Sequence, residues 1–471
     1  MWIRVTVLIG LLNTVLAYNY LFVSPLFGHS HSHFMGTIAD VLTDAGHNVT
    51  VLMPIMDPDM KDTGLRSTKN VIVVPPDNRT AAMFIQKARF MRKLWSIDPS
   101  AYGMIELGMQ IARIFTWQCE KVFNDDEVMD TLGKIRFDVG IAEAFDMCGF
   151  GAMSTKGDVM GMFERLQNVV EITLGAKFFD TLFEMEIAAF RAKFGQDFKD
   201  YQELLAQVSY VFTNSNPYLD YPRPTLHKSI DIGGIAVSFD AHHNALPKEL
   251  DEILNIRETN VIVSFGTVVK SCYMPDEYKK ALLEVFQMVP ATTFIWKYEI
   301  EDSEMIRNLT NVYLSAWLPQ NALLADSRIS AFVTHGGLGS TTEIAYMGKP
   351  AVMVPLFADQ IRNANMLAKH GGAIVLQKYD LISPRRMASA LESIIYNKSY
   401  SMNAKILADM LVNQPISSKQ LMLRHAEFAA RFGRIPNLDP YGRHLTTMQY
   451  YNIDLFLLVF YRITAPKPKT D

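Results

Sequence analysis

The sequence is poor in cysteine, and none of its three cysteines has a close partner. Cys119, Cys148 and Cys272 lack the paired spacing of a metal finger and can supply at most one disulfide bridge. Neither sign of charge dominates either, because the formal net charge of the 471 residues is −4. This balance excludes a global argument for binding nucleic acid or an anionic membrane, so any anion site must be local.

The chain also has few long apolar runs, and two that stand out lie near its ends. Residues 1–17 combine one early basic residue, Arg4, with an apolar run and the small-residue end Val15-Leu16-Ala17, which is typical of a secretory signal peptide. Residues 455–461 are unbroken by a charge but far fewer than the ~20 residues that cross a bilayer. This second run could dock on the protein, lie at a membrane interface or be the remainder of a longer span.

Internal repeats are absent, and strand and helix patterns alternate instead. A strand at 20–25, a helix at 34–42 and a strand at 49–53 form a β-α-β unit, and the alternation restarts with strands at 260–264 and 293–297. A chain of this length exceeds what one hydrophobic core usually organises. The pattern therefore predicts an α/β fold of two doubly wound parallel sheets, with ligands outside the carboxyl ends of the strands.

The turn-rich segment 214–224 marks the predicted domain boundary. Late helices are expected at about 361–370, 384–396 and 402–432. The predicted organisation is a signal peptide at 1–17, a first domain at 18–220, a second domain at 221–432 and a tail at 433–471.

One stretch of the second half predicts an anion site. The apolar strand 329–334 runs into the glycine-rich turn 335–340, and a helix opens there with Thr341. Such a turn presents unpaired backbone N–H groups and the positive end of a helix dipole, which suits a phosphate or diphosphate.

Polar residues that could carry proton chemistry cluster after two strands of the first half. His29, His31 and His33 follow the first strand, and Glu143 and Asp146 follow the buried strand at 137–142. Histidine has the pKa of a general base at neutral pH, and a carboxylate beside it can orient the ring.

A specific signature joins these features. Trp317-Leu318-Pro319-Gln320, His335-Gly336-Gly337, Glu343 and Asp359-Gln360 resemble the donor-binding signature of the animal, nematode-like UDP-glycosyltransferases. The similarity extends from the Ser30-His31 loop to the C-terminal helices. It implies the GT-B fold, in which two Rossmann-like domains face each other, the first binding an acceptor and the second a UDP-sugar.

The resemblance implies a role for each residue that would read the base, ribose and sugar. Trp317 would stack on the uracil, because an indole offers a large π surface. Gln320 would hydrogen-bond the base or ribose, and Glu343 would accept from the ribose hydroxyls. Asp359 and Gln360 would read the sugar hydroxyls.

The resemblance also implies how the diphosphate is held. His335, the backbone at Gly337, and Ser340 would contact it, with Ser264 and Thr267 approaching from the neighbouring strand-end loop. No cofactor is implied beyond the UDP-sugar itself, which is a co-substrate. No metal is implied, and the sequence has no Asp-x-Asp motif of the metal-dependent alternative.

Catalysis in the family uses a histidine that follows a serine at the head of the first helix. Counting back from Gly46-His47 identifies His31, with Glu143 as its carboxylate partner and Asp146 as the runner-up. His29 is expected in the loop before the helix, and His33 is expected to point another way. A single displacement at the anomeric carbon would invert its configuration.

The resemblance predicts transfer of glucose or glucuronic acid from UDP-glucose or UDP-glucuronate to a lipophilic small molecule. It also implies a protein of the endoplasmic reticulum lumen or membrane that often self-associates. One departure favours an alternative: the junction at 149–155 is shorter than in the family by a few tens of residues, including a helix and a strand of the first sheet. The alternative is a catalytically impaired UDP-sugar-binding homologue with a shortened first domain. An epimerase or hydrolase is disfavoured by the Trp-x-x-Gln pattern.

Overall fold

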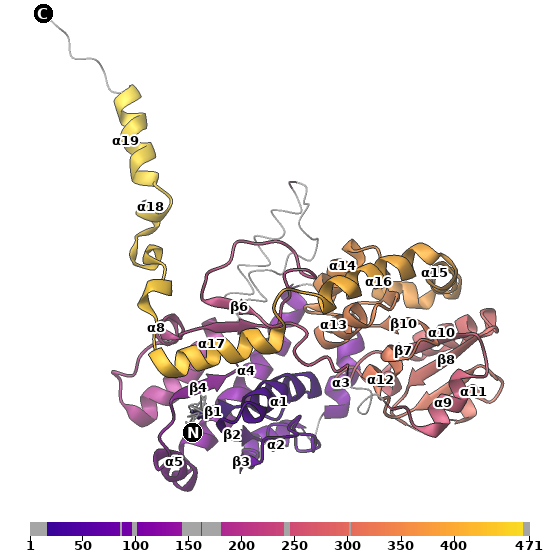
Figure 1. The fold of residues 1–471 in the computed structure, drawn as a ribbon, viewed down its shortest axis with the longest axis horizontal. Helices are drawn as coiled ribbons and strands as arrows, with labels where there is room; N and C mark the ends of the chain where they lie inside the picture. Colours follow the sequence, from indigo (N-terminus) through magenta and orange to yellow (C-terminus); the bar gives the residue numbers. More distant parts are fainter. Residues whose placement is uncertain are drawn as a thin grey trace, which may run out of the picture.

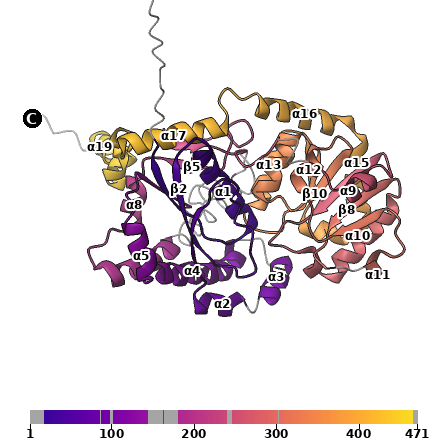
Figure 2. The same cartoon turned by 60° about the horizontal axis from the view of Figure 1, so that its bottom comes forward.

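The computed structural model confirms the predicted α/β fold with two parallel sheets. It describes residues 17–84, 87–96, 101–143, 162, 180–239, 245–300 and 303–464. Asp146, the junction at 149–155 and all but the last residue of the predicted signal peptide lie outside these ranges. Each sheet belongs to one of two lobes that lie side by side, the first lobe in indigo to magenta and the second in pink to orange (Figures 1 and 2).

Among the described residues, the first sheet has four parallel strands in the order β3-β2-β1-β4. They are β1 (Asn19–Val23), β2 (Asn48–Pro54), β3 (Asn70–Val74) and β4 (Val139–Ala142). The surrounding helices are α1 (His29–Asp44), α2 (Asn78–Phe84), α3 (Lys87–Ser96), α4 (Ala101–Phe123), α5 (Asp126–Gly133), α8 (Tyr201–Gln207) and a helix at 180–194. Val23 lies opposite both Leu52 and Ala142, so the loops after β1 and β4 start at the same edge of the sheet.

A separate strand pair follows, formed by β5 (Val211–Thr213) and β6 (Ser229–Asp231). Within the described ranges β4 pairs with β1 alone, and its residues alternate between half-buried and exposed. Residues 144–161, which include the short junction, follow this strand and lie outside the described ranges.

The second sheet has six parallel strands over the residues that the structure describes, in the order β12-β11-β10-β7-β8-β9. They are β7 (Thr259–Ser264), β8 (Thr292–Lys297), β9 (Val312–Ser315), β10 (Ile329–Thr334), β11 (Ala351–Met353) and β12 (Ala373–Val375). Its helices are α9 (Lys248–Leu254), η1 (Ser271–Tyr273), α10 (Asp276–Met288), α11 (Ser303–Ile306), α12 (Gln320–Ala325), α13 (Leu338–Met347), α14 (Gln360–Lys369), η2 (Lys378–Ile382), α15 (Pro384–Tyr396) and α16 (Lys398–Val412). In β7, Val261 and Val263 face one core and Ile262 the other, so helices cover both faces.

The helix predicted at 402–432 is divided in two, so that prediction was wrong. α16 ends at Val412, and α17 (Ser418–Phe432) starts after Pro415, which cannot supply the N–H that a continuous helix needs. The Ser417 hydroxyl accepts from the backbone N–H of Gln420 and so caps the new helix. α17 returns to the first lobe, whose core includes Met422 and Ala426, and it lies along that lobe in Figure 2.

Segments from both lobes meet at Tyr346, near the end of α13. Its hydroxyl accepts from Asn216 Nδ2 at 3.0 Å and donates to the Gly233 carbonyl at 3.1 Å. The same carbonyl accepts from the Ser418 hydroxyl at 2.8 Å. Because Tyr346 is 6% exposed, these hydrogen bonds form a buried tie where the chain passes between the lobes.

Helix α3 joins the lobes at a second place. Trp95 is 1% exposed and packs in a core of the second lobe, and its indole N–H donates to the Lys270 carbonyl at 3.0 Å. A fully buried indole with its N–H satisfied holds α3 against the second lobe.

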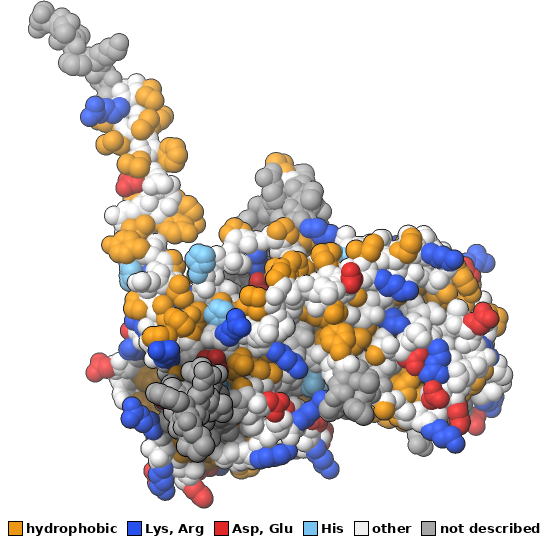
Figure 3. Space-filling view, in the orientation of Figure 1, with side chains coloured by type: hydrophobic (Ala, Val, Ile, Leu, Met, Phe, Trp, Pro, Cys, Tyr) orange, Lys and Arg blue, Asp and Glu red, His pale blue; other side chains and the backbone are white. Residues whose placement is uncertain are grey.

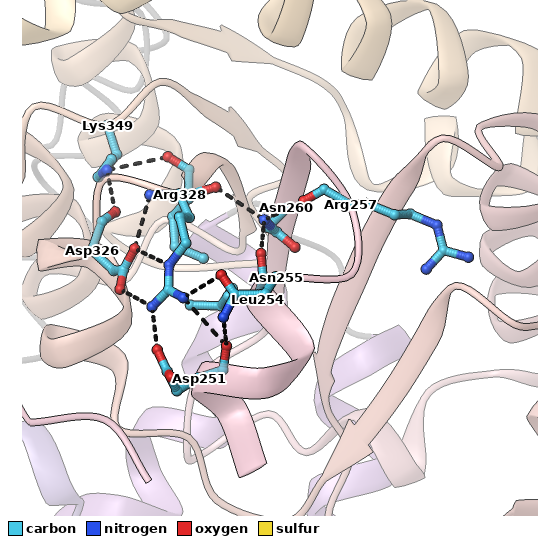
Figure 4. Close-up of polar contacts among 9 residues, drawn as sticks. Asp251, Leu254, Asn255, Arg257, Asn260, Asp326, Arg328 and Lys349 are labelled. Carbon is cyan, nitrogen blue, oxygen red and sulfur yellow. Dashed lines mark hydrogen bonds and ion pairs between the residues drawn. The ribbon is translucent and has the colours of Figure 1, made fainter. Parts of the chain in front are cut away.

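A polar cluster fixes the amino end of β10, the strand that leads to the glycine-rich turn. The Arg328 guanidinium donates to the carboxylates of Asp326 and Asp251 at 2.6 and 2.7 Å, and to Asn255 Oδ1 at 2.9 Å (Figure 4). These contacts hold the pKa of Asp326 below its usual value. Lys349 donates to the Asp326 carbonyl at 2.7 Å, so the entry and exit of the β10–α13 unit are tied together.

The chain ends in an arm that extends from the body of the molecule (Figures 1 and 3). The arm comprises η3 (Pro436–Leu438), η4 (Tyr441–His444), α18 (Thr447–Tyr450) and α19 (Ile453–Thr464). All residues of α19 are exposed, including the apolar run 455–461, so this run does not dock on the described part of the protein. In the described ranges, no helix has both the length and the apolar character needed to cross a membrane.

Candidate functional site

The glycine-rich turn forms as the sequence predicts. β10 ends at Thr334, and Gly337 precedes the first residue of α13. Gly336 adopts φ +84°, and a Cβ there would lie 3.0 Å from the Gln360 carbonyl oxygen, so the turn requires glycine. The amide groups of the first turn of α13 therefore stand at the carboxyl end of the sheet.

His335 is enclosed between two glycines. A Cβ on Gly266 or Gly337 would lie 2.7 or 2.8 Å from the imidazole, so neither position has room for a side chain unless the ring moves. Burial, together with the charge of Lys297, lowers the pKa of His335 to about 4. The ring is neutral at pH 7, so one nitrogen carries a proton that it can donate and the other accepts.

Gln320, Ser340 and Glu343 come together beside this turn. The Gln320 amide donates to the Ser340 hydroxyl at 3.0 Å and to a Glu343 carboxylate oxygen at 2.5 Å. Burial raises the pKa of Glu343 to about 7, although part of the residue's surface stays open. A pKa this far from its usual value, in a residue that keeps some exposure, marks a candidate ligand contact.

Trp317 follows β9 and is 56% exposed, which is unusual for so large an aromatic side chain. The Ser315 hydroxyl donates to its carbonyl at 2.8 Å and fixes the backbone. Lys297 Nζ lies 5.3 Å from the centroid of the indole, within cation–π range. The arrangement leaves much of the ring surface available for stacking.

Lys297 is a candidate that the sequence did not single out. It is the last residue of β8, is 7% exposed and donates to the Gly266 carbonyl at 2.7 Å. Burial lowers its pKa, partly offset by Glu299. The only sequence signal was its position at the carboxyl end of a strand, where ligands bind in such sheets.

Ser264 and Thr267 lie on the loop next to the glycine-rich turn, because Ser264 pairs with Thr334 across β7 and β10. Ser264 is 2% exposed, and its hydroxyl accepts from the Gly266 N–H at 3.3 Å. Ser264 therefore shapes the loop, whereas Thr267 is half-buried in the turn itself.

Asp359 and Gln360 lie at the start of α14. The Gln360 side-chain oxygen accepts from the N–H groups of Leu356 and Phe357 at 2.9 and 3.1 Å. Because this oxygen is engaged, the amide nitrogen is the group that Gln360 can offer a ligand. The Asp359 carboxylate accepts from Asn363 Nδ2 at 2.7 Å.

The first lobe brings His31 and Glu143 into contact. His31 is in the first turn of α1 after β1, and Glu143 directly follows β4. Nδ1 of His31 is hydrogen-bonded to the Glu143 carboxylate. This bond assigns the proton to Nδ1 and the basic lone pair to Nε2. The predicted pair is thus assembled by two adjacent strands.

Aromatic rings stand next to this pair. The Phe27 ring lies 4.6 Å from the His31 ring and 5.0 Å from Phe115, centroid to centroid. Phe115 packs in turn on the buried Leu182. An apolar wall therefore adjoins the imidazole.

The other two histidines differ in part from expectation. His29 is the first residue of α1 rather than a loop residue, and its ring contacts Trp317 of the second lobe with 5.2 Å between centroids. His33 lies one helical turn later and points away from Glu143, as expected, because residues four apart share a helix face that His31 does not. The His29 contact brings the start of α1 against the exposed indole.

Comparison with known proteins agrees with this geometry. The model of the family described as "UDP-glucoronosyl and UDP-glucosyl transferase" matches residues 21–153 and 150–465. A Caenorhabditis briggsae protein provisionally named UDP-glucuronosyltransferase ugt-47 is 26% identical over 96% of this chain and 92% of its own length. UDP-glucosyltransferase 2 of Dactylopius coccus is 31% identical over 57% of this chain and 51% of its own length.

Two solved structures share the arrangement of both lobes. The glycotransferase of kitacinnamycin has a TM-score of 0.59 and 19% identity, covering 90% of this chain and 100% of that one. Os79 from O. sativa, in complex with U2F and trichothecene, has a TM-score of 0.56 and 17% identity, covering 88% and 100%. At these identities the likeness shows the fold alone.

Proposed function

Because this chain belongs to the UDP-glucoronosyl and UDP-glucosyl transferase family, we propose that it transfers glucose or glucuronic acid from a UDP-sugar to a lipophilic small molecule. The acceptor group is a hydroxyl or a similar nucleophile, and the anomeric carbon is inverted. The observation that carries the proposal is the position of α1: His31 meets Glu143 on one side, and His29, two residues earlier, touches Trp317 on the other. The proposed base and the proposed nucleotide platform thus meet at the start of one helix.

The proposed reaction is a single displacement. The acceptor oxygen attacks the anomeric carbon while its proton passes to Nε2 of His31, and the bond from that carbon to the phosphate oxygen breaks. UDP leaves with the bonding electron pair, and attack from the opposite face inverts the configuration. Glu143 stabilises the imidazolium that forms, which is the role of an orienting carboxylate.

The second lobe supplies the groups that would hold the donor. Trp317 stacks on the uracil, and Gln320 and Glu343, which are hydrogen-bonded to each other, bind the ribose. The neutral His335, the amide groups at Gly337 and Ser340, and the nearby Lys297 meet the diphosphate. Positive and N–H groups aimed at the leaving oxygen stabilise UDP as its charge grows.

The apolar wall of Phe27 and Phe115 supports a lipophilic acceptor. Aromatic rings beside a polar base are typical of small-molecule pockets, in which apolar area gives affinity and one polar group sets the orientation. A phenol fits this arrangement, because its ring can pack on Phe27 while its hydroxyl reaches His31.

Turnover tests the proposed function directly. Purified protein is incubated with UDP-glucose or UDP-glucuronate and a panel of phenols, with and without EDTA, and products are identified by mass and anomeric configuration. We expect a glycoside of inverted configuration with one of the two donors, and an unchanged rate in EDTA. Binding of UDP without any glycoside would contradict the proposal.

That contrary result would favour the second candidate, a UDP-sugar-binding homologue with impaired catalysis. The observation behind it is the edge of β4, which pairs with no described strand other than β1. An incomplete first sheet would leave the contact between His31 and Glu143 intact but destabilise the surface that binds the acceptor.

Replacing Lys297 by methionine is expected to weaken UDP binding about tenfold and uridine binding less than twofold. The reason is that a charge-assisted contact to the diphosphate is lost while the base platform remains. Calorimetric titration with both ligands measures the difference. Lys279→Met is a matched control, because Lys279 Nζ also lies over an aromatic ring, that of Tyr298 at 5.7 Å, and contacts no residue assigned to the donor. Equal losses for UDP and uridine would show that Lys297 acts through Trp317 instead.

A further inference from the structure

We propose that His29, held by Asp62, is a positioning residue for the donor nucleotide, through which the first lobe takes part in binding the base. It would hold the Trp317 indole in the orientation that receives the uracil. This inference rests on the proposed function and goes beyond it, because it assigns a nucleotide role to a residue of the acceptor lobe.

The geometry of α1 separates two tasks. His29 and His33 are four residues apart and share one face of the helix, with 5.9 Å between their stacked rings. That face meets the second half of the chain, since the His29 ring contacts Trp317. His31 lies on the other side and contacts Glu143. The start of α1 therefore carries both the proposed catalytic base, His31, and the residue that contacts Trp317, His29.

The contact with Trp317 is edge-on, with an interplanar angle of 63°. This is a favourable arrangement for two aromatic rings, because the positive edge of one ring meets the negative face of the other. Lys297 approaches the same indole, yet Trp317 remains 56% exposed. The indole is thus held by both lobes and still presents open surface to a base.

Asp62 holds His29 in place. Its carboxylate lies 3.1 Å from His29 Nε2 and accepts from the Gly64 N–H at 3.0 Å. An exposed side-chain contact of this kind adds little stability. Their value here is geometric, because the carboxylate fixes the rotation of the imidazole.

The loop that carries Asp62 is itself fixed on α1. The Asp40 carboxylate accepts from three successive backbone N–H groups, those of residues 66–68, at 2.7 to 3.0 Å. Gly36 and Gly64 pack so closely that a Cβ on Gly36 would lie 2.3 Å from the Gly64 carbonyl oxygen. The position of Asp62 is therefore set before any ligand arrives.

A double-mutant cycle on UDP binding tests the inference. The dissociation constant of UDP is measured by calorimetry for the wild type, His29→Ala, Trp317→Ala and the double variant. We expect His29→Ala to weaken UDP binding about three- to tenfold, the range expected for one aromatic pair. In the Trp317→Ala background the same change should have less than a twofold effect. His29→Phe, which keeps an aromatic edge, should restore most of the affinity, and Asp62→Asn should cause a smaller loss.

His425→Ala is the matched control. His425 lies on α17 and makes a similar edge contact with Tyr210, with 4.9 Å between ring centroids. It should leave the affinity for UDP unchanged, and melting temperatures check that all variants fold. Unchanged or tighter UDP binding in His29→Ala overturns the inference, as does an equal loss with and without Trp317. Failure of the wild type to bind UDP at all would instead overturn the proposed function.

Discussion

Replacing His31 by alanine is expected to lower the rate of glycoside formation by about 10²- to 10⁴-fold while the affinity for UDP changes less than twofold. The range is the usual contribution of a positioned general base. Affinity should persist because the groups assigned to UDP lie mainly in the second lobe. The measurements are kcat with the best phenol of the panel and a calorimetric titration with UDP.

Glu143→Gln sharpens the test, because it keeps the shape of the pair and removes its charge. A glutamine can donate from its amide to Nδ1, which would move the ring proton to Nε2 and leave no lone pair facing the acceptor. We therefore expect a large loss of kcat in Glu143→Gln and a smaller one in Glu143→Asp.

The chain offers a matched control for this pair. His47 Nε2 lies 3.3 Å from the Glu427 carboxylate, which is a second histidine–glutamate contact, and neither residue is assigned to the proposed site. Glu427→Gln should leave kcat within twofold of the wild type. Full activity in His31→Ala would show that another group removes the proton, and loss of UDP affinity would point to a disturbed lobe instead.

The proposed donor site was the part that the sequence could predict in most detail, because most of its residues lie in one stretch, 317–360, around the strand–turn–helix unit of β10 and α13. The spacing from Trp317 to Gln320 and from His335 to Glu343 fixes which side chains can meet once β10 and α13 form. The pairing of His31 with Glu143 was also within reach, since both follow adjacent parallel strands.

Other parts of the proposed site depend on contacts between segments that are distant in the sequence, and hydrophobic periodicity does not predict such contacts. Lys297 looks like any charged residue at the end of a strand until the fold brings it to Gly266 and Trp317. His29, predicted in the loop before the helix, is the first residue of α1, because periodicity does not fix a helix start to one residue. The direction of its side chain depends on that start. Pro415 marks the break between α16 and α17, although apolar residues at helical spacing continue on both sides of it.

The affinity for UDP-glucose is expected to rise with pH up to about 7 and then to level off, because an ionised Glu343 accepts from the ribose hydroxyls more strongly than a protonated one. Burial raises the pKa of this carboxyl to about 7 in the free protein, so it is largely neutral at pH 6. If the bound state requires the carboxylate, the affinity rises by up to tenfold per pH unit below that pKa. UDP-glucose is the appropriate ligand, since its diphosphate has no terminal group that titrates near pH 6.

The stability of the free protein should change in the opposite direction. The folded pKa of about 7 lies above the ordinary glutamate value of 4.5, so the folded state binds more protons in this interval. The contribution of Glu343 to stability is therefore fully present below pH 4.5 and is lost as the pH rises to about 7. Denaturant titrations of the wild type and Glu343→Gln measure it, and their difference removes the effect of Glu186, whose pKa burial also raises to about 7.

Glu343→Gln should remove both trends at once. Its amide cannot ionise, so we expect UDP-glucose binding to be independent of pH between 5.5 and 8. At pH 8 we expect this binding to be about ten- to a hundredfold weaker than in the wild type, because a hydrogen bond to a charged group is lost. A pH dependence that persists in Glu343→Gln would assign the titration to another group. In the wild type, binding and stability should show opposite pH trends, and both trends should be absent in the variant. This result would show that the Glu343 carboxylate is buried to bind the ligand rather than to stabilise the fold. A residue that serves packing alone would not improve ligand binding at the pH at which its ionisation destabilises the protein.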